Sequence, residues 1–320
     1  MDQIDKDIVM ALIENGRISF HALARRLNLS VTSVKKRYDR LLENKVILRF
    51  TIYPSLAMLD AEYFWAFLTT TDSTTNEALL NRLGACPMID IITILADGDL
   101  LCWGMYKGSK GLDELTNFLH EQPEISEVEF HTLVVQRGQK CELKPEDVHV
   151  LACLRHDLRM QIKEISQRSG FSPRRVRRIL DKLLLREGST SEFWVKAKGV
   201  GDRLSNLACF HARIDSDVAA TGYTRFLVRI GYQGGSDARW ALVEWLQQRY
   251  PLEIWYTFAS ASEPVIFTLF LLEYMSQTPE LIRAVRAAPG VVSVKQIIHY
   301  QHRFYPGLNE AFWDTLQLPE

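Results

Sequence analysis

The feature of the sequence that most constrains the fold is an internal repeat. Two segments about 142 positions apart follow one plan of three short amphipathic helices, with a tight turn before the third helix and basic residues on its outer face. The first copy lies within residues 3–43 and the second within residues 146–188, where His156-Asp157 takes the place of Asn15-Gly16. Because one plan appears twice, chance is a poor explanation for either copy, and a duplicated architecture is predicted.

The third helix of the second copy has the strongest pattern. It begins at Ser172, a residue type that caps helices, and at Pro173, which suits the first helical turn. Apolar residues at three- and four-residue spacing form one face, and a dense group of cations forms the other. The apolar residues are Val176, Ile179, Leu180, Leu183 and Leu184. A solvated basic surface helix would have the same pattern, so the first copy has to supply the context.

In the first copy, Ser30 aligns with Ser172 and begins a similar helix. Three helices with a tight turn and a basic outer face are typical of a helix-turn-helix unit, whose last helix lies in a DNA groove. Residues 46–47 and 50–53 then predict a short strand, the wing. In the second copy, residues 189–206 predict a longer wing hairpin that turns at residues 199–202.

DNA contact requires cations for the phosphates and polar side chains near the start of the recognition helix for base edges. The candidates in the first copy are Thr32, Ser33, Lys35, Lys36, Arg37 and Arg40. Those in the second copy are Arg174, Arg175, Arg177, Arg178 and Lys182, and arginine can bind guanine with two hydrogen bonds. The alternative is that some of these side chains are only solvated or paired with acids.

The net charge of −1 hides a segregation of charge along the chain. Residues 1–50 carry +4 and residues 144–190 carry +5, whereas residues 51–143 carry −9 and residues 191–320 carry −1. The positive charge therefore lies in the two helix-turn-helix segments, where the local field matters more than the sum.

Each copy is followed by a segment whose pattern predicts a βαββαβ module. The fold class is therefore α+β: two winged helix-turn-helix domains, each followed by a ferredoxin-like module with helices on one face of an antiparallel sheet. The elements of the first module are expected at 63–70, 76–83, 88–95, 100–106, 112–120 and 128–135. Those of the second are expected at 223–230, 239–249, 252–258, 265–272, 279–287 and 291–300. The domains are 1–53, 54–138, 139–214 and 215–305, with a tail at 306–320 that could pack back as a short helix through Phe312, Trp313 and Leu316.

The helix-turn-helix residues resemble those of the leucine-responsive regulator/AsnC (Lrp/AsnC) family. In the first copy the resemblance is carried by Ile4, Asp5, Ile8, Leu12, Asn15, Gly16, Arg17, Leu23, Ala24, Leu27, Asn28, Leu29, Ser30, Val34, Arg37, Arg40, Leu41, Val46 and Ile47. The second copy is similar but looser, through Ile165, Phe171, Ser172, Val176, Leu180 and Leu183. The βαββαβ modules also resemble the regulatory and dimerisation domain of that family.

The resemblance implies a DNA-binding transcription regulator rather than an enzyme, without a cofactor, whose sheets pair back to back. The effector of such proteins is often an amino acid, and Asp97, Gly98 and Asp99 fall where the family has a Gly/Asp turn near its effector pocket. The second module has the sequence A-S-A-S-E-P at 259–264 instead, so the first module is the better candidate. The expected partners are double-stranded DNA, a small effector and further copies of the chain.

The remaining residue types argue against several other classes. Five scattered cysteines without a C-x-x-C pair disfavour a disulfide framework or a zinc ribbon and fit a reducing cytoplasm. The N-terminal residues lack the apolar core of a signal peptide, and no run of about 20 apolar residues predicts a membrane span. His299 and His302 are expected on opposite faces of a strand, and no carboxylate or cysteine completes a metal-ligand spacing, so the histidines are interpreted as surface residues and no metal is expected. The tryptophans are interpreted as core residues.

Two other functions remain open at this point. Some proteins with an architecture similar to that of this family decarboxylate a tetrapyrrole, which they bind between βαββαβ modules through basic and histidine side chains. The basic recognition helices favour DNA over that reaction. A sequence-tolerant architectural DNA-binding protein is the third alternative, and it predicts little loss of affinity when the site is scrambled.

Overall fold

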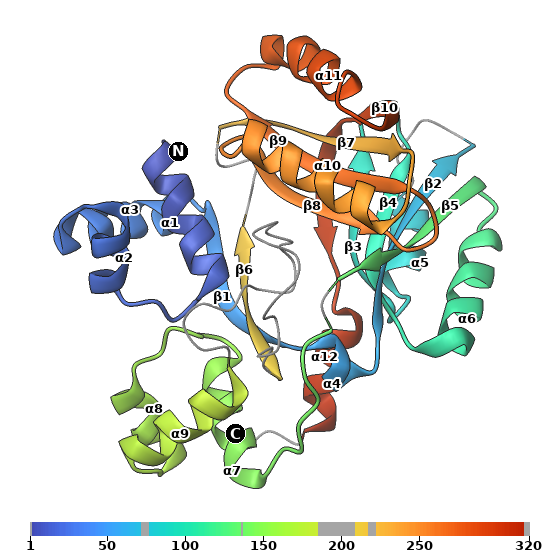
Figure 1. The fold of residues 1–320 in the computed structure, drawn as a ribbon. Coiled ribbons are helices and arrows are strands. Elements are labelled where there is room, and N and C mark those ends of the chain that lie inside the picture. Colours follow the sequence, from blue (N-terminus) through green and yellow to red (C-terminus); the bar gives the residue numbers. More distant parts are fainter. Residues whose placement is uncertain (1, 72–76, 136, 185–208, 217–221, 317–320) are drawn as a thin grey trace.

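The computed structural model describes residues 2–71, 77–135, 137–184, 209–216 and 222–316, and it has a mixed α/β fold (Figure 1). Two three-helix units lie on the side of the molecule opposite helices α5 and α6. The first unit contains α1 (Gln3–Glu14), α2 (Phe20–Leu27) and α3 (Val31–Glu43). The second contains α7 (Pro145–Leu154), α8 (Ile162–Ser169) and α9 (Pro173–Leu183). Helices therefore occur where both copies of the repeat predict them.

Local signals explain where α3 and α9, the two predicted recognition helices, begin. The hydroxyl of Ser30 accepts a hydrogen bond from the amide of Ser33, and the hydroxyl of Ser172 accepts one from Arg175. The turns before them contain Asn28, with φ 54°, and Gly170, with φ 72°. These are left-handed conformations, which asparagine and glycine adopt more readily than other residues.

The strand predicted as the first wing is β1 (Ile47–Pro54), and its partner comes from the second half of the chain. It pairs antiparallel with β6 (Phe210–Ser216), with Tyr53 opposite His211, to form a two-stranded sheet. The sequence did not predict this pairing, because nothing local relates strands about 160 residues apart. The wing hairpin expected at 189–206 lies outside the described residues.

The two predicted βαββαβ runs are present, with boundaries shifted by a few residues. The first consists of β2 (Glu62–Thr70), α5 (Glu77–Gly84), β3 (Ile89–Leu95), β4 (Leu100–Tyr106), α6 (Gly108–His120) and β5 (Ile125–Val134). The second consists of β7 (Thr224–Tyr232), α10 (Ser236–Arg249), β8 (Ile254–Ser260), β9 (Val265–Leu272), α11 (Thr278–Arg286) and β10 (Val291–Ile297). The sequence did not predict the short helices α4 (Leu56–Leu59) and η2 (Met275–Gln277).

The strands of both runs form one nine-stranded sheet in the order β10-β7-β9-β8-β5-β2-β4-β3-β11. The predicted strand at 291–300 is wrong at its end, because the chain breaks at Ile298 and continues as β11 (His299–Phe304), which pairs with β3 of the first run. The long strand β5 likewise pairs with β2 and, through its last residues, with β8 of the second run. The last strand of the first run thus reaches the second run, and β11, which follows the last strand of the second run, reaches the first.

The two halves of this sheet face each other across an aromatic core. The ring of Trp65 on β2 lies 5.3 Å from that of Phe267 on β9 and 5.2 Å from that of Phe258 on β8. In a flat sheet β2 and β9 would be roughly 14 Å apart, because two strands separate them and strands are spaced about 4.8 Å apart. The sheet therefore curls back on itself, and Trp65, which is 1% exposed, lies in the core as expected.

The tail forms the helix α12 (Gly307–Thr315), as predicted. This helix packs on β6 and on the end of α7 as well as on the nine-stranded sheet. Trp313 is buried and its ring lies 5.9 Å from that of Phe210 on β6. Glu310 forms an ion pair with Arg155 at the end of α7. Helix α12 also contacts β3 and β4, so it connects the sheet to the second three-helix unit.

Two expectations about single residues were wrong. Cys141 and Cys209, which are 68 positions apart, are paired in a disulfide, whereas the scattered spacing argued against one. The spacing of the cysteines cannot show that the segment before α7, which contains Cys141, folds back beside the start of β6. In the turn after α7, the Asp157 carboxylate accepts the hydrogen bond that Asn15 accepts in the first copy, so Asp157 rather than His156 aligns with Asn15.

Candidate nucleic-acid interface and ligand pocket

The predicted DNA-contact residues divide into two groups according to their partners. Among the described residues, five of the cations form no ion pair with a carboxylate: Lys35, Lys36, Arg174, Arg177 and Arg178. All five are exposed, as is Thr32, whereas Ser33 is partly buried. These side chains lie on the recognition helices with their charge available to an anionic partner.

The two arginines of α3 are instead held by the start of α1. Arg37 forms ion pairs of 2.5 Å with Asp2 and 2.8 Å with Asp5, and Arg40 forms one of 2.6 Å with Asp5. Hydrogen bonds to Asp2 and Asp5 raise the pKa of the Arg37 guanidinium above its ordinary value. Either arginine would have to leave a carboxylate to reach a phosphate, so both stabilise the unit in the absence of DNA.

The second unit repeats this arrangement in part. Lys182 lies 2.6 Å from Asp147, which is 142 positions after Asp5 and, like Asp5, is 1% exposed. Both aspartates also accept a backbone hydrogen bond at the start of the first helix of their unit. Each one therefore ties that helix to the recognition helix. Sequence reasoning missed the pair, although an acid three residues after a helix cap was the available signal.

Arg175 is also engaged, because it pairs with Glu146 and its guanidinium lies 5.0 Å from the ring of Phe171. The structure thus separates Arg175 from its neighbours Arg174 and Arg178 on the same helix. Whether any of the predicted residues contacts DNA remains a prediction.

A first prediction distinguishes the two groups. Replacing Arg37 with alanine should lower the free energy of unfolding by about 1 kcal/mol, because Asp5 is buried and loses one of its two partners. Replacing the unpaired Lys36 should instead leave stability unchanged and reduce the salt dependence of DNA binding by about one unit of slope. Urea unfolding and binding titrations at several salt concentrations measure both quantities. The opposite pattern in the two variants would contradict the division.

The predicted effector turn borders a pocket of about 490 Å³ that both halves of the chain line. Asp97 and Asp99 lie at its wall, and Gly98 between them has φ 92°, which allows the tight turn. The other charged residues of the wall are Glu127, Glu129, Arg229 and Lys295. The pocket therefore offers carboxylates from the first run and cations from the second.

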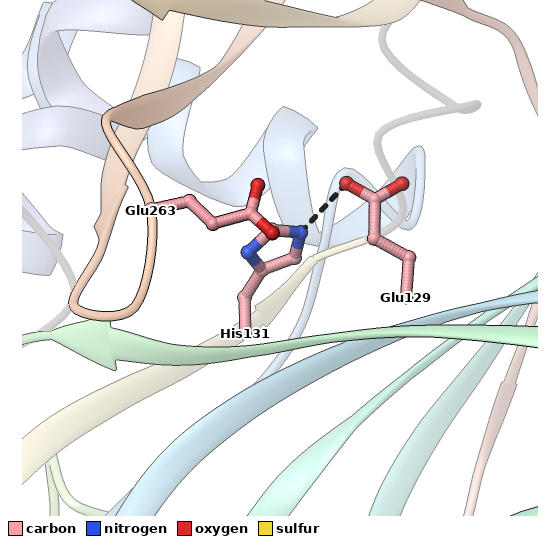
Figure 2. Close-up of side chains that lie close together, drawn as sticks. All are labelled: Glu129, His131 and Glu263. Carbon is pink, nitrogen blue, oxygen red and sulfur yellow. Dashed lines mark hydrogen bonds and ion pairs between the residues drawn. The ribbon is translucent and has the colours of Figure 1, made fainter.

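Beside this pocket, Glu129, His131 and Glu263 form a cluster that Figure 2 shows. His131 is fully buried, with Nε2 2.9 Å from Glu129 and Nδ1 3.0 Å from the hydroxyl of Ser260. Arg229 donates to Glu129 at 2.9 Å and to Glu263 at 3.2 Å. The hydrogen bond with His131, and then the charge of Arg229, lower the pKa of the Glu129 carboxyl. Arg229 thus supplies a cation to both glutamates.

The sequence interpretation of the histidines was wrong in two respects. His131, His211 and His299 are buried rather than on the surface, and two carboxylates approach His131. Glu129 lies two residues before it on the same strand, whereas no sequence spacing relates Glu263 to it. His299 and His302 were expected on opposite faces, but their rings lie 5.5 Å apart. A register shift between residues 299 and 301 inserts one extra residue, which brings both side chains to the same face. Burial lowers the pKa of His299 to about 3.

The comparisons with known proteins agree with the helix-turn-helix geometry. Residues 1–42 match the model of the AsnC-type helix-turn-helix domain. An HTH-type transcriptional regulator of Pyrococcus horikoshii is 28% identical over 124 residues, which are 38% of this chain and 76% of the relative. Another of Pyrococcus furiosus is 32% identical over 68 residues, which are 21% of this chain and 45% of the relative.

Solved structures that resemble the chain over nearly its whole length include the siroheme decarboxylase NirDL in co-complex with an iron-uroporphyrin III analogue, with a TM-score of 0.58, 12% sequence identity and coverage of 98% of this chain and 97% of that chain. The crystal structure of the siroheme decarboxylase NirDL covers 98% of both chains, with a TM-score of 0.57 and 10% sequence identity. At this identity the likeness is one of fold.

The paired three-helix units define a helix-turn-helix protein. The comparisons confirm its resemblance to the Lrp/AsnC family, and they support a DNA-binding transcription regulator of the AsnC type. Within the described residues, no helix is long and apolar enough to cross a membrane.

Proposed function

We propose that this chain is a sequence-specific transcription regulator in which one polypeptide acts as a pseudo-dimer. The observation that carries the proposal is the pair of recognition helices: α3 and α9 occupy equivalent places in two repeated units, and both expose cations that lack an acidic partner among the described residues. Each unit with its strand β1 or β6 would be one DNA-binding domain, at 1–53 and 139–214, and each βαββαβ run one regulatory domain, at 54–138 and 215–305.

The strand pairing supports the pseudo-dimer. Strand β1 of the first half pairs with β6 of the second, β5 with β8, and β11 with β3. Exchange of equivalent strands in both directions is what a two-fold related pair of units would produce. Because α3 presents Thr32, Ser33 and lysines where α9 presents arginines, the DNA site should be an imperfect palindrome. Its half-sites should lie about 10 base pairs, or a multiple of that, apart.

Genomic DNA selection with the purified chain, followed by footprinting, tests the proposal. Two protected half-sites of related but unequal sequence are expected. Protection of one isolated half-site would contradict the pseudo-dimer. Equal affinity for a scrambled site would favour the architectural alternative.

For the effector we propose an amino acid in the pocket at Asp97, Gly98 and Asp99. The carboxylates of the first run suit an ammonium group, and Lys295, which forms no ion pair with a carboxylate among the described residues, suits a carboxylate, so a zwitterion would satisfy both sides. The prediction is that Lys295→Met and Asp97→Asn each weaken amino-acid binding by about tenfold. DNA affinity without the amino acid should not change, because neither residue lies on a helix-turn-helix unit.

Isothermal titration with a panel of amino acids measures this effect, and deaminated analogues provide the control. An analogue without the ammonium group should bind both wild type and Asp97→Asn weakly and equally. If neither substitution alters binding of an amino acid that wild type binds, the pocket is not the effector site.

Tetrapyrrole decarboxylation is the second candidate, and the likeness of fold to the siroheme decarboxylase favours it. The pocket counts against a polycarboxylate substrate, because four of its six charged side chains are acids. An absorbance scan of the chain purified from its native host, and anaerobic incubation with sirohaem followed by mass spectrometry, separate the two functions. A bound tetrapyrrole whose mass falls by that of carbon dioxide would contradict the regulator proposal and support the decarboxylase.

A further inference from the structure

The two helix-turn-helix units contact each other through the turns that join their first and second helices. Arg17 in the first turn donates to the carbonyl oxygen of Met160 at 3.0 Å and to that of Leu158. Arg159 in the second turn donates to the carbonyl oxygen of Gly16 at 2.7 Å and to that of Ile18 at 3.1 Å. Each guanidinium therefore binds two backbone carbonyls of the opposite turn.

The contact is reciprocal residue by residue. Arg17 and Arg159 are 142 positions apart, as are the carbonyls that they bind. An internal hydrogen bond holds each turn in the same shape: the amide of Arg17 donates to Asn15 at 3.0 Å, and that of Arg159 donates to Asp157 at 2.8 Å. One surface thus meets its own copy, which is the geometry of a two-fold interface.

Burial and geometry make this contact specific to arginine. Both arginines are partly buried at this contact, and burial lowers the pKa of each below its ordinary value. The planar fork of arginine can donate to two carbonyls at once, whereas the ammonium of lysine is a single point that cannot span them as well. The backbone carbonyls of the opposite turn therefore compensate the cost of burying each cation while the turns are in contact.

The two arginines are not equal, because Arg159 also lies among aromatic rings of the first unit. Its guanidinium carbon is 5.1 Å from the ring centre of Phe20, 5.3 Å from that of Tyr38 and 5.8 Å from that of Phe50. At such distances cation–π attraction adds to the hydrogen bonds. Among the described residues, Arg17 has no comparable ring contact, so loss of Arg159 should weaken the interface more than loss of Arg17.

We propose that Arg17 and Arg159 are positioning residues that lock the two helix-turn-helix units into one body and thereby determine which half-site spacing the chain accepts. This inference rests on the proposed function, since it concerns how two recognition helices reach one DNA site. Neither arginine is assigned a contact with DNA. The turn contact and the pairing of β1 with β6 together hold the units as a rigid pair. Loss of the turn contact should leave the units joined through the strands but freer to adapt to other spacings.

The test uses the full chain and the operator found by genomic selection, with one to five base pairs added between its half-sites. Arg17→Met/Arg159→Met removes both guanidiniums and keeps most of the apolar stems. Arg283→Met/Arg286→Met is the matched control, because it removes two exposed charges from α11, far from the turns in sequence. Affinity for each DNA is measured by fluorescence anisotropy.

Wild type and the control should lose about tenfold or more in affinity when five base pairs are added, because the half-sites then face opposite sides of the double helix. Arg17→Met/Arg159→Met, the clamp variant, should bind the native spacing about tenfold less tightly than wild type. Its affinity should vary less than about threefold across the series of spacings. Arg159→Met alone should reduce the dependence of affinity on half-site spacing more than Arg17→Met alone. A clamp variant with the wild-type profile would overturn the inference.

Hydrogen exchange provides a second readout that does not depend on DNA. Amides at 15–18 and 157–160 should exchange faster in the clamp variant than in the control, and equal exchange would overturn the locking. Arg17→Lys/Arg159→Lys keeps both charges and serves the same test if the methionine variant does not fold. If wild type binds no DNA at all, the proposed function fails, while exchange at the two turns still decides whether the arginines lock the units.

Discussion

Replacing Arg174 and Arg178 together with alanine is expected to weaken DNA binding about 100-fold near 100 mM salt and to reduce the salt dependence by about two units of slope. The two side chains are exposed one helical turn apart near the start of α9, and neither has an acidic partner among the described residues. Their charge is therefore already free for phosphates or guanine, and DNA binding breaks no ion pair. Fluorescence anisotropy between 50 and 300 mM salt measures both effects.

The control for this variant is Arg283→Ala/Arg286→Ala on α11, which changes the net charge equally but lies in the second βαββαβ run. It should keep the wild-type slope within about half a unit, because distant surface charges are screened at these salt concentrations. Equal losses of affinity in both variants would show a general effect of net charge. They would contradict the placement of α9 in the DNA groove.

The Arg175→Ala variant is expected to lose less DNA affinity than a variant at Arg174 and more stability. Because Arg175 pairs with Glu146 and lies over the ring of Phe171, its removal should cost some stability and less DNA affinity than removal of Arg174. The sequence alone placed both arginines in one group. It shows which side chains are charged, but the partner of Arg175 lies 29 residues earlier, on a different helix.

The elements that the sequence predicted well are those with local signals. The caps at Ser30 and Ser172 and the apolar spacing of α9 depend on residues within one or two helical turns, so the helices begin where expected. The pairing of β1 with β6 and of β3 with β11 depends on residues about 160 and 210 positions apart, which no local pattern relates. The disulfide of Cys141 and the approach of Glu263 to His131 were missed for the same reason.

The same distinction applies to the candidate site. The effector turn at Asp97 could be found from its type and its likeness to the family turn, and it does border a pocket. The opposite wall of that pocket, with Arg229 and Lys295, comes from strands of the other half of the chain and required the three-dimensional structure. Reciprocal residues such as Arg17 and Arg159 could have been aligned by the repeat, but the repeat does not show that they meet.

A large pH effect is expected from Lys6 on α1, whose side chain is 4% exposed and whose Nζ has no hydrogen-bond partner among the described residues. Burial lowers its pKa from the ordinary value of 10.5 to about 8, although the charges of Glu253 and Asp7 oppose the shift. The equivalent position of the second unit holds Val148, so the repeat tolerates an apolar side chain there.

The sign of the effect follows from which state binds the proton more tightly. Between pH 8 and pH 10.5 the unfolded chain keeps a proton on Lys6 that the folded chain releases, so the contribution of Lys6 to the free energy of unfolding rises with pH in this window. From pH 8 to pH 9.5 Lys6 should contribute a rise of about 1.5 kcal/mol. The buried thiols of Cys86 and Cys102 oppose this rise, because burial raises their pKa values and they ionise in the unfolded chain at lower pH. The contribution of Lys6 is therefore the difference in slope between wild type and Lys6→Met. Below pH 8 the lysine is protonated in both states and contributes no slope.

Lys6→Met should remove this rise, and Lys163→Met, at an exposed position of α8, should keep it. Urea unfolding at half-unit steps from pH 7 to pH 9.5 measures the slope. The range stops there because burial raises the pKa of Tyr256, and ionisation of that tyrosine in the unfolded state near pH 10 would lower stability again. An unchanged slope in Lys6→Met would mean that the Lys6 side chain is hydrated in solution. Helix α1 would then not be held against the second βαββαβ run near Glu253 as the structure has it.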